Sequence, residues 1–395
     1  MTSSWPLAGT PHLVWVYAHS MAEKLDAATW LETTRALRDL NWRVTLITAG
    51  PAGMQRIRGV EVLCIPQPRV YLLGQLIYHL GVIRLVAFEG VKTDVLLFHQ
   101  MSAFWLLPLR LVRRLMGGQH PLLVMDTRTL PMSWATWRDR LRALFYKLTH
   151  WLANRCMDGQ TAITRRMAQA VSIPKEKLWG VWPSGVDLDQ FSPAQMARRW
   201  PLAGEPIHLI YVGLLNHERN LMALCQAVED AHAEGMSFTL SLVGKGTEQV
   251  ALQEFAQQTE VRVRILSPVP HGEVPQLLAQ AHIGVLPFPD GEEFQVSSPV
   301  KLFEYMAAGL PVLATRIACH TDVLADGSYT FWAEEASAQG LLAALRLVWG
   351  AHAALSTMGS DIAKSAQAWT WQESASKLKD AMEHGMRCAS HRERV

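Results

Sequence analysis

Lys301 and Glu304 are the side chains whose type and spacing most directly suggest chemistry, and both lie in the segment 297–315, SSPVKLFEYMAAGLPVLAT. Ser298 is predicted to cap a short helix, with Pro299 at the first helical position, where the missing N–H costs nothing. A lysine in the first turn of a helix is disfavoured by the macrodipole, whereas a bound anion reverses that effect. Glu304, one turn later, can accept hydrogen bonds from hydroxyl groups. The pattern suits a ribose diphosphate, and an ordinary capped helix with a solvated lysine is the alternative.

The same segment predicts how this helix ends. Gly309 suits the left-handed conformation that stops a helix, and Pro311 prevents the helix from continuing. Residues 311–315 then form a short apolar run that is typical of a buried strand. The segment is therefore expected to form a loop, a short helix, a tight stop and a strand.

Strand-like and helix-like patterns alternate through the first half of the chain. Strands are predicted at 12–18, 42–48, 60–65, 94–98, 122–125 and 159–164, and helices at 29–40 and 75–88. This alternation predicts an α/β fold with a parallel, doubly wound sheet. Because ligands of such sheets bind beyond the carboxyl ends of the strands, we expect His19, His99 and Asp126 to face a ligand.

A second alternating pattern begins at residue 207. Its strands are predicted at 207–212, 238–243, 261–266 and 283–287. Gly213, Gly244 and Gly246 follow strands and would let the backbone approach a ligand, although such glycines equally mark tight turns. The chain is therefore predicted to contain two doubly wound halves, joined by a linker at 194–204, with a ligand site in the cleft between them.

Composition excludes several classes of function. The net charge of +2 is close to neutral and does not favour nucleic acid as a partner. The five cysteines include no CxxC pair, which favours reduced thiols over a disulfide framework or a zinc site. Asp187 and Asp189, beside a Gly-Val turn, are expected to cap a turn or helix rather than to bind a metal. The N-terminus lacks a signal-peptide pattern and no apolar stretch could cross a bilayer, so we expect a cytoplasmic protein.

Residues 110–158 are locally basic and rich in aromatic side chains. This segment contains nine Lys or Arg against three Asp, a local net charge of +6. A basic, aromatic amphipathic helix can lie on an anionic lipid surface. The alternative, which we favour at this point, is a helix with a solvated basic face. In that interpretation Leu141, Leu144, Leu148 and Leu152 form its core-facing stripe.

Several motifs, taken in order, resemble those of the retaining GT-B glycosyltransferases of family 4. They are PSGVDLDQF at 183–191, YVG at 211–213 with RNL at 219–221, LVGKG at 242–246, IGVLP at 283–287 and KLFEYMAAGLPV at 301–312. Each motif is weak alone, but their common order is a strong signal that covers most of the chain. The resemblance implies a GT-B fold of two Rossmann-like domains facing a cleft. It also implies a nucleotide-diphosphate sugar as donor substrate and requires no separate metal or cofactor.

The resemblance also implies roles for individual residues. Glu304 would bind the ribose hydroxyls of the nucleotide sugar, while Arg219 and Lys301 would neutralise its diphosphate. His99 and Asp126 would orient or polarise the acceptor and the transferred sugar. The expected substrate-binding positions are Gly213, Gly244, Gly246, Val269, His271, Ser297, Ser298 and Glu304. Of these, Val269 to His271 would face the base.

Three departures from the family pattern bear on activity. Val296 stands where the family usually has a second Glu that contacts sugar hydroxyls, and Glu292 and Glu293 are candidates to replace it. Leu214 stands where an Arg is frequent after the YVG turn, and residues 18–26 lack the usual Gly-rich loop. These departures support a second hypothesis, a catalytically silent GT-B protein that binds a nucleotide or a partner. A sugar epimerase of the same architecture fits the 301–309 motif less well.

The resemblance completes the expected organisation. An acceptor-side domain is expected at 1–195, a donor domain at 196–372, and a C-terminal helix that packs back on the first domain at 373–395. The expected reaction is transfer of a hexose with retention to a glycan or to a lipid-linked precursor of a polysaccharide. The expected location is the cytoplasm, with peripheral contact at the inner face of the membrane.

Overall fold

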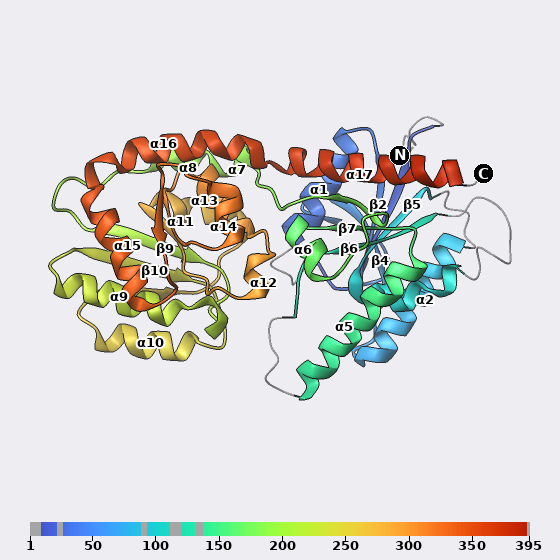
Figure 1. Cartoon of the computed structure of the whole chain (residues 1–395), viewed down its shortest axis with the longest axis horizontal. Coiled ribbons are helices and arrows are strands. Elements are labelled where there is room, and N and C mark those ends of the chain that lie inside the picture. The colour runs from blue at the N-terminus through green and yellow to red at the C-terminus, as the bar shows by residue number, and fades with distance from the viewer. Residues whose placement is uncertain (1–8, 22–26, 88–92, 111–120, 132–136, 393–395) are drawn as a thin grey trace. The chain divides into compact units, whose positions relative to one another are not determined.

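The computed structural model describes residues 9–21, 27–87, 93–110, 121–131 and 137–392 (Figure 1). The chain divides into two compact units, of which unit 1 contains residues 1–183 and 371–395 and unit 2 contains residues 184–370. Asp26, Phe88 and the basic residues between 111 and 120 lie outside the described residues. Each unit contains its own sheet and its own hydrophobic core.

Unit 1 is built on an eight-stranded sheet with the order β3-β4-β2-β1-β5-β6-β7-β8. Its strands are β1 His12–Tyr17, β2 Arg43–Ala49, β3 Gly53–Ile57, β4 Val60–Ile65, β5 Val95–His99, β6 Leu122–Thr127, β7 Gly159–Ala162 and β8 Leu178–Val181. Its helices are α1 Ala27–Asp39, α2 Tyr71–Ala87, α3 Ala103–Leu106, α5 Trp137–Cys156, α6 Arg165–Ala170 and α17 Trp371–Arg392. All pairs are parallel except β3 with β4, an antiparallel edge that the sequence pattern did not predict.

Strand β1 shows why helices must cover both faces of this sheet. All six of its side chains are buried, because alternate residues point to opposite sides of a strand. Leu13, Trp15 and Tyr17 join the core under α1 and α17, whereas Val14 and Val16 join the core under α2, α3 and α5. A parallel strand buried on both faces is the pattern that a doubly wound sheet requires.

Unit 2 is built on a six-stranded, fully parallel sheet with the order β11-β10-β9-β12-β13-β14. Its strands are β9 Ile207–Val212, β10 Phe238–Val243, β11 Arg262–Leu266, β12 Ile283–Leu286, β13 Val312–Thr315 and β14 Thr330–Ala333. Its helices are α7 Leu188–Phe191, α8 Pro193–Ala197, α9 Leu221–Ala233, α10 Gln249–Gln258, α11 Val274–Ala279, α12 Glu292–Gln295, α13 Val300–Ala307, α14 Ala318–Leu324, α15 Ala338–Gly350 and α16 Leu355–Ser365. Strands β8 and β14 were not among the predicted strands.

The chain passes between the units at 183/184 and again at 370/371, not at the expected positions 195/196 and 372/373. The segment 194–204 is not a free linker, because it begins inside α8, which packs on α11. The C-terminal helix expected at 373–395 is present as α17, Trp371–Arg392. Helix α16 ends at Ser365, and α17 begins at Trp371 and packs within unit 1 against α1 and β8.

Arg198 explains why residues 194–204 belong to unit 2. Its guanidinium is buried and donates three hydrogen bonds, to the carbonyl oxygens of Ala281 at 2.7 Å, Gly309 at 2.9 Å and Leu278 at 2.9 Å. These carbonyls lie in the last turn of α11 or just beyond the ends of α11 and α13, where helix ends leave acceptors unpaired and the macrodipole favours a cation. Burial lowers the pKa of Arg198 to about 10, so the side chain stays charged at neutral pH.

Among the described residues, no single helix is long and apolar enough to span a membrane. One pair, residues 338–350 and 352–369, meets the criterion of length and composition only when its two parts are taken together across a 66° bend. Leu341, Leu345 and Val348 of this pair are buried in the core of unit 2.

We predict that Arg198→Met lowers the free energy of unfolding of unit 2 by about 2–4 kcal/mol, because three buried carbonyls lose a charged donor. Urea unfolding followed by circular dichroism measures this change. The adjacent Arg199→Met is the control, since Arg199 is exposed and pairs only with Glu205 at 2.7 Å. An exposed pair contributes about 0–1 kcal/mol. Equal midpoints for the two variants would contradict this account.

Candidate functional site

Two glycine turns at the carboxyl ends of neighbouring strands form the floor of the candidate site in unit 2. Gly213 follows β9 and Gly244 follows β10, both with φ of +154°, a conformation that L side chains rarely adopt. A Cβ on Gly213 would lie 2.8 Å from Cε of Lys301, and a Cβ on Gly244 would overlap the carbonyl oxygen of Gly213. These positions therefore need glycine for close approach, as the sequence pattern indicated.

Arg219 and Lys301 are brought together at this floor, although they are far apart in sequence. The guanidinium of Arg219 lies 5.2 Å from the ring centres of Phe288 and Phe294. The ammonium of Lys301 lies 5.6 Å from the ring of Phe288 and 5.5 Å from that of Tyr211. Both cations therefore share the face of Phe288 as a neighbour, at distances where a cation is attracted to an aromatic ring.

Within the part of the chain that the structure describes, neither of the two cations forms a hydrogen bond or an ion pair, although Glu304 lies close enough to act on the charge of Lys301. Burial and, to a smaller extent, the charge of Arg219 lower the pKa of Lys301 to about 8, and the charge of Glu304 opposes them. Two like charges held together in this way make a site for an anion.

The side chain of Asn220 anchors the turn before α9 and so positions Arg219 in the site. It adopts the left-handed conformation, with φ of 59°, between the short 3-10 turn His217–Arg219 and α9. Its side-chain amide donates to the carbonyl oxygens of Pro287 at 3.0 Å and Ala336 at 2.5 Å. Sequence analysis missed this anchor, because both acceptors lie more than 60 residues away and no local pattern marks them.

Helix α13 begins one residue later than expected, and Ser298 does not cap it. Pro299 is the N-cap and forms no side-chain hydrogen bond, so Lys301 is the second helical residue. The hydroxyl of Ser298 instead accepts from the N–H of Ser184 at 3.0 Å, and the hydroxyl of Ser184 donates to the carbonyl oxygen of Ser298 at 2.9 Å. The hydroxyl of Ser297 donates to Phe294. The first turn of α13 therefore lacks a side-chain cap beside Lys301, which suits a bound anion.

The other end of α13 agrees with the sequence prediction. Gly309 has φ of +65°, and its N–H donates to the carbonyl of Met306 at 2.9 Å. The N–H of Leu310 donates to the carbonyl of Tyr305 at 2.9 Å, which completes a Schellman stop. The hydroxyl of Tyr305 accepts a hydrogen bond from the N–H of Val212 at 3.0 Å and so connects α13 to β9.

Glu304 is buried and pairs with His271 at 2.8 Å between Oε1 and Nε2. The amide of Gln190 donates to Nδ1 of His271 at 3.2 Å and to its carbonyl oxygen at 3.1 Å. Because Nδ1 accepts, Nε2 carries the proton that is donated to Glu304. The family resemblance placed His271 near the nucleotide base. It did not predict the hydrogen bonds of His271 with Glu304 and with Gln190, which belongs to the PSGVDLDQF motif. Asp187 caps α7 by accepting from Gln190 N–H at 3.2 Å, as expected.

The remaining predicted positions in unit 2 lie against the core or the backbone, or on the surface. Val269 is partly buried and packs on the core, and Gly246 lies against the backbone of Leu215. Val296 is buried at 4% exposure, so this position offers no polar group to a ligand. Glu292 and Glu293 are in the first turn of α12, and Leu214 is 36% exposed.

His99 and Asp126 lie at neighbouring positions in unit 1, at the carboxyl ends of β5 and β6. Burial, followed by the charges of His19, Arg128 and His150, lowers the pKa of His99 to about 3. The imidazole is therefore neutral at ordinary pH. Its Nδ1 accepts from the N–H of Met101 at 3.4 Å, which leaves the proton on Nε2.

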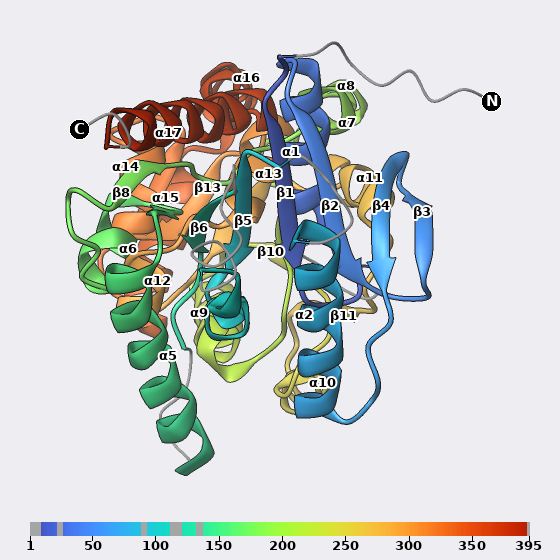
Figure 2. The same ribbon diagram turned by 90° about the vertical axis from the view of Figure 1, so that its right-hand side faces the viewer.

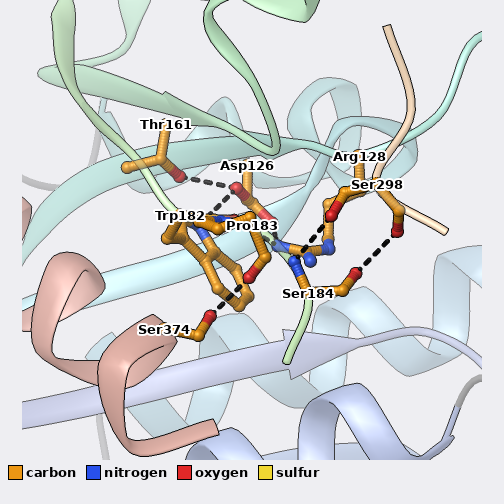
Figure 3. A network of polar contacts seen from close by, with 8 residues as sticks. All are labelled: Asp126, Arg128, Thr161, Trp182, Pro183, Ser184, Ser298 and Ser374. Carbon is orange, nitrogen blue, oxygen red and sulfur yellow. Dashed lines mark hydrogen bonds and ion pairs between the residues drawn. The ribbon is translucent and has the colours of Figure 1, made fainter. Parts of the chain in front are cut away.

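Asp126 has no exposed surface, and its carboxylate makes polar contacts with neighbouring side chains (Figure 3). Its Oδ1 accepts from the hydroxyl of Thr161 at 2.6 Å and from the indole N–H of Trp182 at 2.9 Å. Its Oδ2 lies 3.8 Å from Arg128, whose guanidinium stacks 3.7 Å from the Trp182 ring. Burial raises the pKa of Asp126, and the charge of Arg128 opposes that rise.

We predict that Lys301 titrates near pH 8 and that Arg219→Gln moves its pKa upward, because a repelling charge is removed. Glu304→Gln should move the pKa downward. NMR of the chain labelled at the lysine ε-carbon measures both shifts, and Lys301→Met identifies the signal by its loss. A Lys301 signal that is unmoved by Arg219→Gln would show that the two cations do not interact.

Comparison with known proteins matches the sequence motifs to a family. Residues 206–349 match the family model described as glycosyl transferases group 1. The WcaL protein of Escherichia coli, named as a colanic acid biosynthesis glycosyltransferase, is 29% identical over 150 residues, which cover 37% of this chain and 36% of WcaL. A 2-deoxystreptamine glucosyltransferase of Streptomyces kanamyceticus is 26% identical over 312 residues, 72% of this chain and 79% of that protein. The chain thus matches about a third of WcaL and most of the second relative.

Solved structures establish the fold. Sucrose-phosphate synthase from Thermosynechococcus elongatus superposes with a TM-score of 0.71 at 16% identity and covers 98% of this chain and 100% of that one. HepE from Anabaena, solved with UDP and glucose, superposes with a TM-score of 0.68 at 16% identity, covering 97% and 99%. Both are GT-B glycosyltransferases, as predicted for this chain. Residues 206–349 are thus similar to glycosyl transferases group 1, and the chain has the GT-B fold.

Proposed function

We propose that the protein is a retaining glycosyltransferase that moves a sugar from a nucleotide-diphosphate sugar to an acceptor hydroxyl. The observation that carries this proposal is the pair Arg219 and Lys301, which lies beside the uncapped start of α13 and forms no ion pair among the described residues. A diphosphate supplies the negative charge that this arrangement lacks. Glu304, one turn along α13, would accept from the ribose hydroxyls.

The same residues would lower the barrier to the reaction. The bond from the anomeric carbon to the phosphate oxygen breaks, and the acceptor oxygen forms the new bond to that carbon on the same face. The acceptor proton leaves with the released nucleoside diphosphate or to solvent. Arg219, Lys301 and the first N–H groups of α13 would stabilise charge that develops on the leaving phosphate, which is usually the largest catalytic effect. This proposal assigns that charge to side chains and requires no separate metal.

His99 is proposed to act on the sugar or the acceptor. Its neutral imidazole with the proton on Nε2 can donate a hydrogen bond to a hydroxyl but cannot supply a positive charge. Asp126 would hold Trp182 and Thr161 rather than touch a substrate. The acceptor is proposed to be a glycan or a lipid-linked polysaccharide precursor. This assignment is supported by relatives named for colanic acid biosynthesis and for phosphatidyl-myo-inositol mannosyl transfer.

A catalytically silent nucleotide-binding protein is the second candidate, and the buried Val296 favours it. An apolar residue at that position removes a contact that the resemblance assigns to the donor sugar, while the phosphate site stays intact. Isothermal titration with UDP, GDP and ADP separates the candidates when combined with a panel of donor sugars. Tight nucleotide binding without turnover of any donor would establish the silent protein.

We predict that Arg219→Gln and Glu304→Gln each reduce donor turnover by about 100- to 1,000-fold, because each removes an interaction with the donor in the transition state. Release of nucleotide from the best donor of the panel measures turnover. Arg316→Gln is the matched control, since Arg316 is a half-exposed arginine of unit 2 that pairs with Glu334 at 2.8 Å. Full turnover in both site variants would exclude this site.

We also predict an alkaline limb in the pH profile of kcat/KM with an apparent pKa near 8, the value for Lys301 without ligand. The protonated lysine attracts the diphosphate, so activity is present below this pKa and is lost as the pH rises through it. Lys301→Arg should keep activity constant to a higher pH, because a guanidinium does not deprotonate in this range. An alkaline limb that is unchanged in Lys301→Arg would assign the titration to another group.

A further inference from the structure

Unit 1 carries a large exposed apolar surface on α2, α3 and α5, which we call the α2–α3–α5 face. Thirteen of the 20 exposed large apolar side chains of the described residues belong to it. They are Val70, Tyr71, Leu72, Leu73, Leu76, Ile77, Leu80, Phe104, Trp137, Leu141, Leu144, Leu148 and Trp151. The other seven are dispersed over both units, so this clustering is a property of one surface. A contiguous exposed apolar surface marks a site of interaction.

Helix α5 exposes three of the four leucines of the expected core-facing stripe, Leu141, Leu144 and Leu148, while Leu152 is half-buried. Trp137, Leu141, Leu144, Leu148 and Trp151 follow each other at spacings of four and three residues, which places them on one helix face. Their exposed fractions run from 45% to 67%. The stripe is therefore a solvent-facing ridge in this structure.

The opposite side of α5 holds the helix on unit 1 with different residues. Its buried members are Ala143, Tyr146, Thr149, His150 and Ala153. The hydroxyl of Tyr146 donates to the carbonyl of Thr129 at 3.0 Å, and His150 is 3.1 Å from the hydroxyl of Thr127. Small and polar side chains thus supply the contacts with the sheet, and the leucines are left free for another partner.

Helices α2 and α3 extend the same surface. The exposed fractions of Leu72, Leu76 and Leu80, at spacings of four, are 67%, 42% and 53%. Residues 71–87 contain no Asp or Glu. Phe104 of α3, itself 46% exposed, contacts the ring of Phe145 at 6.3 Å, and α3 packs on both α2 and α5. Figure 2 shows α2 and α5 running in similar directions at separate places on unit 1.

The charges on α5 select the kind of partner. Arg138, Arg140, Arg142, Lys147 and Arg155 are exposed, against the single acid Asp139, so the helix carries a net charge of +4 at neutral pH. Helical spacing puts Arg140 and Lys147 directly beside the apolar ridge. Arg138 lies 5.5 Å from the Trp137 ring and Arg155 lies 4.6 Å from the Trp151 ring, so each end of the ridge pairs a tryptophan with an arginine.

We propose that the α2–α3–α5 face docks on an anionic lipid bilayer, with α5 lying in the plane of the interface. The ridge would enter the boundary between headgroups and acyl chains, and the flanking cations would contact anionic headgroups. Tryptophan beside arginine suits this boundary, because both combine an apolar body with a polar group. A protein partner would need an acidic apolar surface of equal extent, whereas an anionic bilayer supplies both properties everywhere. Docking uses none of the residues placed in the phosphate site, so its test is independent of catalysis.

Flotation of the full chain with lipid vesicles tests this proposal. We expect the protein to float with vesicles of phosphatidylcholine containing about 30% phosphatidylglycerol, and to float less with phosphatidylcholine alone. Leu141→Gln/Leu144→Gln/Leu148→Gln should reduce the bound fraction at least about 10-fold, because it removes the ridge. Arg140→Gln/Lys147→Gln should reduce binding to the anionic vesicles about 10-fold and weaken its dependence on salt.

Matched controls remove similar side chains from unit 2. Met196→Gln/Val250→Gln/Leu347→Gln replaces three residues that are 91%, 65% and 59% exposed, and Arg262→Gln/Arg264→Gln removes two exposed charges of β11. Both should float like the unchanged protein, and circular dichroism confirms that each variant is folded. No flotation, no preference for anionic vesicles, or equal losses in the controls would overturn the proposal. The proposal would also be overturned if no variant bound vesicles and light scattering showed that the unchanged protein is a dimer and the ridge variant a monomer. The face would then join two copies of the chain.

Discussion

The burial of the Lys301 ammonium beside the charge of Arg219 is the constraint on which the rest of unit 2 depends. Lowering the pKa of a lysine from 10.5 to about 8 corresponds to about 3 kcal/mol of unfavourable environment for its charged form. This is a sizeable fraction of the stability of a typical domain. A fold that retains such a charge must hold it in place by contacts elsewhere. A ligand with two or more negative charges then recovers that free energy on binding.

The supporting contacts are distributed over the unit rather than concentrated at the site. Asn220 holds the residue after Arg219, and the hydroxyl of Tyr305 joins α13 to β9. Arg198 binds a carbonyl in the last turn of α11 and one just beyond the end of α13, so the helix that carries Lys301 and Glu304 is anchored at its far end. Each anchor is a hydrogen bond between segments distant in sequence. The geometry of the site is therefore a property of the whole unit.

Local sequence patterns predicted the parts of the structure that depend on neighbouring residues. The stop at Gly309 and the strand after it follow from backbone conformation alone, and both were predicted. Ser298 was expected to cap α13 because nothing local shows that Ser184, 114 positions earlier, takes its hydroxyl. The segment 194–204 resembled a linker because the acceptors of Arg198 lie about 80 to 111 positions away. The meeting of Arg219 with Lys301 could be predicted only through the family resemblance.

Helix α5 shows a different limit of sequence patterns. A period of three and four residues identifies an apolar face but does not say what covers it, since a core and a lipid surface demand the same spacing. The structure resolves this ambiguity for unit 1, because Tyr146, Thr149 and His150 already occupy the side that faces the sheet. The leucines therefore contribute little to the stability of the unit. The proposed anionic bilayer accounts for their position on one exposed ridge, beside cations rather than acids.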